Sequence, residues 1–93
     1  MRNIHRSTAF KRDYKREGKG QHREALDELL QDVFSVLATD QPLDPRFRDH
    51  NLSGDWDGHR ECHLKPDLLL IYRKLESGVL ELVRLGSHSE LFR

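Results

Sequence analysis

The chain has 93 residues, with sixteen Lys and Arg, sixteen Asp and Glu, and a formal net charge of zero. This length predicts one compact domain, which we place at residues 1–93. No apolar run approaches the roughly 20 residues that a membrane-spanning helix needs, so we expect no membrane association. The single cysteine, Cys62, cannot form an internal disulfide, which favours a cytoplasmic protein.

The charge is unevenly distributed along the chain. Residues 1–24 carry eight Lys and Arg against three Asp and Glu, whereas residues 25–93 carry eight against thirteen. Such asymmetry indicates an anionic partner such as nucleic acid, although a solvated, ion-paired helix surface explains it equally well. If the partner is a nucleic acid, we expect the contacting cations to be Arg2, Arg6, Lys11, Arg12, Lys15 and Arg16.

The N-terminal half predicts a strand followed by two helices. Residues 2–7 are typical of a short strand, and Thr8 is a suitable N-cap for the helix that follows. Gly18 and Gly20 end that helix. Residues 21–38 then have apolar side chains at the spacing of an amphipathic helix. We therefore expect a helical hairpin, followed by a proline-containing loop over residues 40–49.

The C-terminal half has the pattern of strands. Residues 56–64 alternate loosely, and residues 68–75 and 79–85 form apolar runs of strand length. Ser77-Gly78 between the last two runs is a good hairpin turn. The expected fold is therefore α+β, with the helices on one face of a small antiparallel sheet.

Residues suited to acid–base chemistry gather in residues 46–67 and 86–92. Cutting RNA without a metal needs a base for the 2′-hydroxyl, an acid for the leaving 5′-oxygen and positive charge on the phosphate. Histidine can fill any of these roles near neutral pH, a carboxylate can be the base, and arginine is a fixed cation. The sequence offers this set in His50, Arg60, His63, Asp67 and His88.

A metal site is the main chemical alternative. His59 and His63 would stand roughly 13 Å apart on a strand, which is too far for two ligands of one ion. Cys62 would point to the opposite strand face and is better read as a small packed residue. We therefore expect no metal and no cofactor, and assign no role to His59.

The same segments resemble the signatures of YafQ-type toxins, within the RelE/ParE superfamily of bacterial toxin–antitoxin systems. The central resemblance is Asp49-His50-x-Leu52-x-Gly54-x-Trp56-x-Gly58-x-Arg60-x-x-His63-x-x-x-Asp67, continuing to Leu70-Ile71-Tyr72. The C-terminal resemblance is Arg84-x-Gly86-x-His88-x-x-Leu91-Phe92. With the opening strand and helices, the resemblance covers essentially the whole chain.

The resemblance implies a RelE-like fold and a toxin that cuts messenger RNA, typically in the ribosomal decoding site. It also implies a cognate antitoxin that holds the toxin inactive, and through which alone the toxin reaches operator DNA. The positions that match catalytic residues of the family are His50, His63, Asp67 and His88. Phe92 matches an aromatic residue near the substrate and Arg60 a basic position that we assign to phosphate contact. The chain departs from some relatives at Leu68, where they have an aromatic residue.

Other residues of these motifs have structural interpretations. Gly54 and Gly58 permit unusual backbone angles, and Trp56 and Tyr72 are typical of a core. Two alternative functions are open to this fold: a ParE-like toxin that binds DNA gyrase without catalysis, and a degenerate member that only binds an antitoxin. The acid–base set favours the enzyme.

Overall fold

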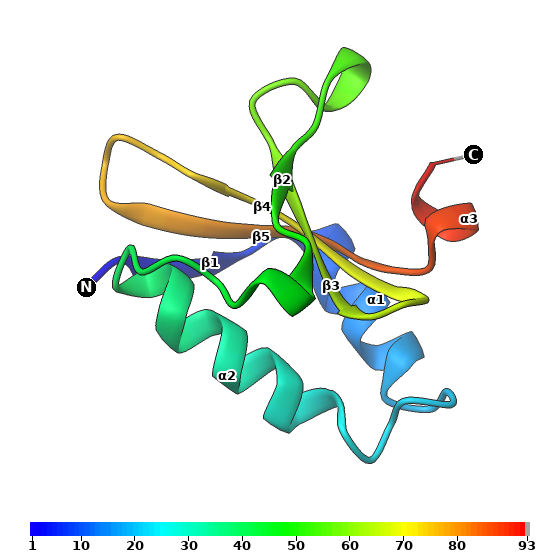
Figure 1. Cartoon of the computed structure of the whole chain (residues 1–93). Coiled ribbons are helices and arrows are strands. Elements are labelled where there is room, and N and C mark those ends of the chain that lie inside the picture. The colour runs from blue at the N-terminus through cyan, green and yellow to red at the C-terminus, as the bar shows by residue number, and fades with distance from the viewer. Residues whose placement is uncertain (93) are drawn as a thin grey trace.

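The computed structural model describes residues 1–92, and Arg93 lies outside the described residues. Figure 1 shows a sheet with two longer helices beneath it and a short C-terminal helix at one end. The elements are β1 Asn3–Arg6, α1 Thr8–Glu17, α2 Leu26–Ala38, the 3₁₀ turn η1 Pro45–Phe47, β2 His50–Asn51, the 3₁₀ turn η2 Gly54–Trp56, β3 Arg60–Lys65, β4 Leu68–Lys74, β5 Val79–Gly86 and α3 His88–Leu91. The predicted α+β class is confirmed.

The sheet has five strands in the order β1-β5-β4-β3-β2. The pairs β3·β4 and β4·β5 are antiparallel, as expected, and so is the pair β2·β3, but β1 pairs parallel with β5. The sheet is therefore mixed rather than wholly antiparallel. The two helices between β1 and the remaining strands provide the long crossover that a parallel pair requires.

Alternation along the strands separates two apolar clusters. Cys62, Leu70 and Tyr72 are buried with Phe10 of α1 and the apolar side of α2, which places both helices on one sheet face. Leu69 and Ile71 are buried on the opposite face, together with Leu91 of α3. The main core thus lies between the sheet and α1 and α2, and a smaller one lies beneath α3.

Several predicted boundaries differ from the structure. Ser7, not Thr8, caps α1, because its side chain accepts a hydrogen bond from the backbone N–H of Phe10. The second helix begins at Leu26 rather than at residue 21. The sequence analysis did not predict the short elements β2 and α3, which depend on pairing with β3 and on a capping box formed by Ser87 and Glu90.

The expected conformations of two glycines are confirmed. Gly54 and Gly58 have φ of +66° and +86°, a region that L side chains rarely adopt. They bracket the turn that leads from β2 into β3. Among residues 1–92, no helix is long and apolar enough to cross a membrane.

Candidate functional site

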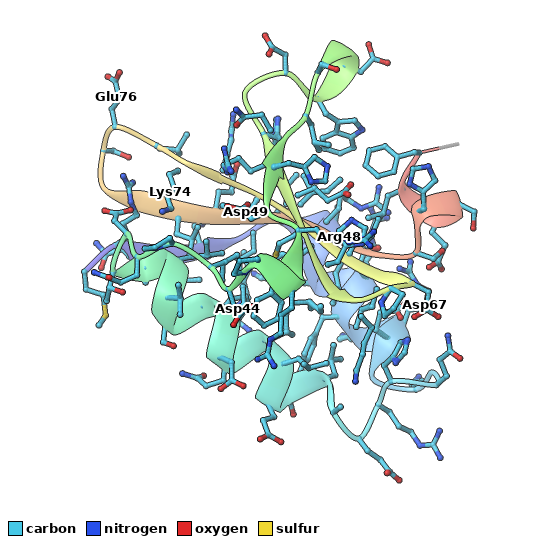
Figure 2. All side chains as sticks on the ribbon, viewed as in Figure 1. Asp44, Arg48, Asp49, Asp67, Lys74 and Glu76 are labelled. Carbon is cyan, nitrogen blue, oxygen red and sulfur yellow. The ribbon has the colours of Figure 1, made fainter. Side chains whose placement is uncertain are left out.

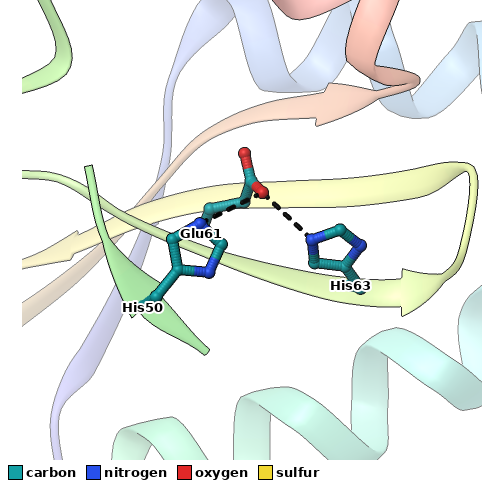
Figure 3. A group of neighbouring side chains, drawn as sticks. All are labelled: His50, Glu61 and His63. Carbon is teal, nitrogen blue, oxygen red and sulfur yellow. Dashed lines mark ion pairs between the residues drawn. The ribbon is translucent and has the colours of Figure 1, made fainter. Parts of the chain in front are cut away.

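A buried carboxylate joins two histidines on the sheet face opposite α1 and α2. His63 and Glu61 lie two residues apart on β3, so their side chains share a face. His50 on β2 is the direct partner of Glu61 in the strand register. One carboxylate oxygen of Glu61 lies 3.1 Å from His63 Nε2 and 3.5 Å from His50 Nε2 (Figure 3). We call these three residues the histidine–glutamate cluster.

Exposure within the cluster is graded. Glu61 retains only 5% of its accessible surface, whereas the His63 side chain is 22% exposed and that of His50 49% exposed. A substrate can therefore touch the two imidazoles, while the carboxylate holds them from below. An ionised carboxylate only accepts hydrogen bonds, so Glu61 favours the tautomer of His63 that carries its proton on Nε2, the nitrogen 3.1 Å away. Nδ1 of His63 is then free to accept a proton.

The backbone before β2 fixes His50. Arg48 has a left-handed conformation with φ of 49°, and its carbonyl oxygen lies 2.6 Å from His50 Nδ1. Asp49 between them accepts hydrogen bonds from Tyr72 and from Arg60. Because Tyr72 belongs to the core, this aspartate anchors the His50 segment to the sheet.

Arg60 takes part in that anchor rather than in the histidine–glutamate cluster. Its guanidinium donates to Asp49 Oδ2 at 2.9 Å and also contacts the side chains of Tyr72 and Asn51. The hydrogen bond that Arg60 donates to Asp49 is the largest cause of a raised Arg60 pKa. Burial raises the pKa of Tyr72, so its hydroxyl remains a neutral donor. Arg60 thus links the start of β3 to the segment before β2. Because side chains alternate along a strand, Arg60 lies on the opposite strand face from Glu61 and His63.

Asp67 lies apart from the cluster, at the turn between β3 and β4. Figure 2 shows it at the far end of this hairpin from Asp49. Its carboxylate accepts a hydrogen bond from Gln21 and lies 2.8 Å from His22 Nε2. The contact with His22 lowers the pKa of the Asp67 carboxyl group. The structure therefore connects this predicted catalytic residue to the segment between α1 and α2.

His88 and Phe92 lie on and just after α3. Their ring centroids are 4.8 Å apart, and the Phe92 ring also lies 6.2 Å from Trp56. His63 is paired with Leu69, which is paired with Gly86. Two strand spacings, or roughly 10 Å, therefore separate His63 from the backbone that leads into α3. Phe92 packs against the apolar group that contains Leu69 and Ile71, so it lies on the same sheet face as the histidine–glutamate cluster, and His88 contacts its ring.

The predicted RNA-contacting cations of the N-terminal region lie elsewhere. Lys11, Arg12 and Lys15 are exposed on α1, which covers the other sheet face. Two further cations of that set hold intramolecular carboxylates: Arg2 pairs with Asp40, and Arg16 pairs with Asp13, Glu17 and Glu90. The structure does not bring the basic helix to the histidine–glutamate cluster.

The sequence analysis missed Glu61. Its signal was its spacing of two from His63 in a predicted strand, which places both side chains on one face. Cys62 between them is buried in the main core, and burial raises the pKa of its thiol. The burial confirms the expectation that Cys62 is a packed residue. A thiol held in its neutral form is also a poor nucleophile.

The cluster has the composition and geometry of a metal site. The contacting atoms of His50, Glu61 and His63 all lie within 4.8 Å of one another. Two nitrogens and one oxygen, each about 2.0–2.2 Å from a single ion, are a common donor set for zinc and related metals. The sequence analysis considered His59, His63 and Cys62 for this role and expected no metal; of these three, only His63 belongs to the set.

A model of a protein family matches residues 2–93, and this family is described as bacterial toxin of type II toxin–antitoxin system, YafQ. The chain belongs to the YafQ family. The mRNA interferase toxin YafQ of Escherichia coli strain K12 is 34% identical over 92 residues, which are 99% of this chain and 97% of that protein. The resemblance inferred from the two motifs is thereby confirmed.

Solved structures of YafQ-like toxins share the fold. A metal-bound toxin from Helicobacter pylori has a TM-score of 0.83 at 46% identity, covering 99% of this chain and 100% of that one. The Escherichia coli DinJ–YafQ complex contains a chain with a TM-score of 0.80 at 30% identity, and the match covers 100% of both chains. A metal and a protein partner are thus described for relatives in this family, and the histidine–glutamate cluster of the present chain suits the former.

Proposed function

We propose that this protein is the toxin of a type II toxin–antitoxin system and an endoribonuclease that cuts messenger RNA in the ribosomal decoding site. The observation that carries the proposal is the buried Glu61 carboxylate held against two partly exposed histidines. A carboxylate that orients an imidazole is a recurrent device for general base catalysis. The relative described as an mRNA interferase, which matches almost the whole chain, supports the choice of RNA as substrate.

His63 is the proposed base. With Nε2–H donated to Glu61, its Nδ1 takes the proton from the 2′-hydroxyl of the RNA. The 2′-oxygen then forms a bond to phosphorus, and the bond from phosphorus to the 5′-oxygen breaks. The products are a 2′,3′-cyclic phosphate, which water can open to a 3′-phosphate, and a free 5′-hydroxyl.

His50 is the proposed stabiliser of the phosphate. Its two ring nitrogens face the Arg48 carbonyl and the Glu61 carboxylate, which are both acceptors. A doubly protonated imidazole donates to both and adds positive charge beside the reacting phosphate. The Arg60 guanidinium, fixed by Asp49, adds a further positive charge at the entry to the same strand.

His88 is the proposed acid, which gives its proton to the leaving 5′-oxygen. It is exposed at the start of α3 and lies against Phe92 with its ring tilted by 37°, and the Phe92 ring offers a surface for a base of the substrate. Asp67 is retained as a site residue that acts from the β3–β4 turn. Lys11, Arg12 and Lys15 on α1 are proposed to contact ribosomal RNA phosphates away from the reaction centre.

The proposed reaction uses acid–base groups alone and includes no step at a metal. If a metal binds, His50, Glu61 and His63 would hold it, and it would supply positive charge at the phosphate. A metal would also occupy the ring nitrogens that hold Glu61. A chelator should therefore leave a metal-free reaction unchanged and should abolish a reaction that depends on the bound metal.

The partner proposed for this chain is a cognate antitoxin, since a DinJ–YafQ complex exists for a relative at 30% identity. A toxin that acts on ribosomes must be silenced in the cytoplasm that contains them, and it reaches operator DNA only through the antitoxin. A toxin that acts only by binding DNA gyrase would have no need of the acid–base residues in the histidine–glutamate cluster.

The deciding experiment incubates the purified protein with translating ribosomes and maps the ends of the messenger RNA. We expect internal cuts with 5′-hydroxyl ends, and loss of these cuts in His63→Ala and in His88→Ala. Cys62→Ser is the matched control and should cut normally. Intact messenger RNA with the unaltered protein would overturn the proposed function.

A further inference from the structure

A basic pocket adjoins the histidine–glutamate cluster, and its three cations, Arg46, Arg48 and Lys65, have no role in the chemistry proposed above. It has a volume of about 410 Å³, within the range of small-ligand sites. His63 belongs to both the pocket and the cluster. The walls come from η1, the end of β3, the turn after it and one residue of α2: Leu29, Arg46, Phe47, Arg48, His63, Leu64, Lys65 and Pro66.

The three cations of this pocket are not neutralised. Arg46, Arg48 and Lys65 are exposed, and none of the lining residues is acidic. Within residues 1–92, none of the three forms an ion pair, whereas Arg73 and Arg84 on the adjoining sheet each hold a carboxylate. Three unpaired cations around one cavity attract an anion.

The pocket is built on a fixed backbone. The Asp44 side chain accepts the backbone N–H of Arg46 at 2.9 Å and caps η1. The Arg46 guanidinium lies 4.7 Å from the centroid of the buried Phe47 ring, which holds it by a cation–π interaction. Arg48 follows in the left-handed conformation, and its carbonyl contacts His50. Arg46 and Arg48 are therefore positioned by the segment that also positions His50 of the cluster, and Lys65 comes from the end of β3.

We propose that the basic pocket binds a phosphate of the substrate RNA that neighbours the phosphodiester being cut. This inference rests on the proposed function and adds a binding subsite to it. A strand whose reacting phosphate lies at His63 must continue past that residue, and His63 is itself a wall of the pocket. Arginine and lysine are the preferred partners of phosphate oxygens, and the apolar wall formed by Leu29, Leu64 and Pro66 leaves a surface for the ribose.

The test compares RNAs that differ by one phosphate, with a 2′-O-methyl group at the cleavage position to block the reaction. A dinucleotide carries only the reacting phosphate, and two trinucleotides add one more on its 5′ or its 3′ side. NMR titration of the purified protein measures each dissociation constant at several salt concentrations. We expect one trinucleotide to bind about tenfold more tightly than the dinucleotide. The slope of log affinity against log salt should steepen by about 0.7.

The double variant R48Q/K65Q should remove this gain and leave dinucleotide binding nearly unchanged. The matched control R23Q/K19Q removes two exposed cations from the segment between α1 and α2, and should keep the gain. In the ribosome assay, R48Q/K65Q should raise KM about tenfold with a smaller effect on kcat.

Two outcomes separate failure of the pocket from failure of the function. If the unaltered protein cuts messenger RNA but R48Q/K65Q keeps the trinucleotide gain, the pocket proposal is wrong and the proposed function stands. If the unaltered protein leaves messenger RNA intact, the proposed function fails and the pocket proposal fails with it.

Discussion

Replacing Glu61 by glutamine tests the centre of the proposed mechanism. The Gln side-chain oxygen can take the place of the carboxylate oxygen that lies 3.1 Å from His63 Nε2, so the His63 ring should keep its position. What disappears is the negative charge that fixes one tautomer and stabilises the imidazolium once His63 has taken a proton. Removing such an orienting carboxylate from a catalytic histidine costs up to about 10⁴-fold in kcat. We expect a fall of about 10²–10⁴-fold, which corresponds to about 3–5 kcal/mol of transition-state stabilisation.

The assay is the rate of messenger RNA cleavage on ribosomes across a pH series, with thermal unfolding measured in parallel. Glu81→Gln is the matched control, since Glu81 is a half-buried carboxylate on the neighbouring strand β5 that pairs with Arg73 at 2.5 Å. It should retain nearly full activity. Orientation by Glu61 would be refuted if Glu61→Gln cut at the normal rate with an unchanged pH profile, or if Glu81→Gln lost as much activity.

Three further predictions follow from other contacts. Asp13→Asn should lower the free energy of unfolding by about 3 kcal/mol and the Tm by about 12 °C, because Arg84 loses a buried partner. Burial raises the pKa of Asp13, but the hydrogen bonds from Arg84 and from the Leu85 N–H outweigh it, so the pKa of Asp13 is lowered in the folded state. The stability that Asp13 contributes is therefore present above about pH 4 and is lost as the pH falls through the folded-state pKa. Calorimetry across a pH series should show this acid loss in the unaltered protein and not in Asp13→Asn. Asp67→Asn should reduce cleavage more than His22→Ala, whereas equal losses would make the contact between them a purely structural one. With magnesium kept constant for the ribosomes, a zinc-selective chelator should leave cleavage intact and added zinc should slow it; cleavage abolished by this chelator and restored by zinc would contradict the metal-free mechanism.

The sequence predicted the fold class and most strands because hydrophobic periodicity is local. The apolar runs that became β4 and β5 are long enough to identify without any tertiary information. Helix α2 was placed correctly at its C-terminal end but begins at Leu26, since the side chains of Gln21 and His22 reach Asp67 instead of continuing a helix. The residues in contact are more than forty positions apart in the sequence, so no local pattern can predict the contact.

The candidate site was divided in the same way. The sequence names His50, His63 and His88 as candidates from their chemistry and from the resemblance, because an acid–base set is visible in a list of residues. The grouping of His50 and His63 around Glu61 depends on the register of β2 against β3, which the short β2 strand alone could not predict. Arg60 likewise contacts Asp49 rather than the cluster, because alternate side chains of β3 point to opposite faces.

The sequence by itself determined that this is a small α+β domain with an acid–base set in two segments that resemble those of YafQ-type toxins. Only the tertiary structure decided that a buried glutamate holds the two histidines and that three cations without an ion pair in residues 1–92 line a pocket beside them. The reason is physical: residue type and periodicity follow from neighbours along the chain. The burial of a charge and the neutralisation of a cation depend instead on residues brought together from distant strands, turns and helices.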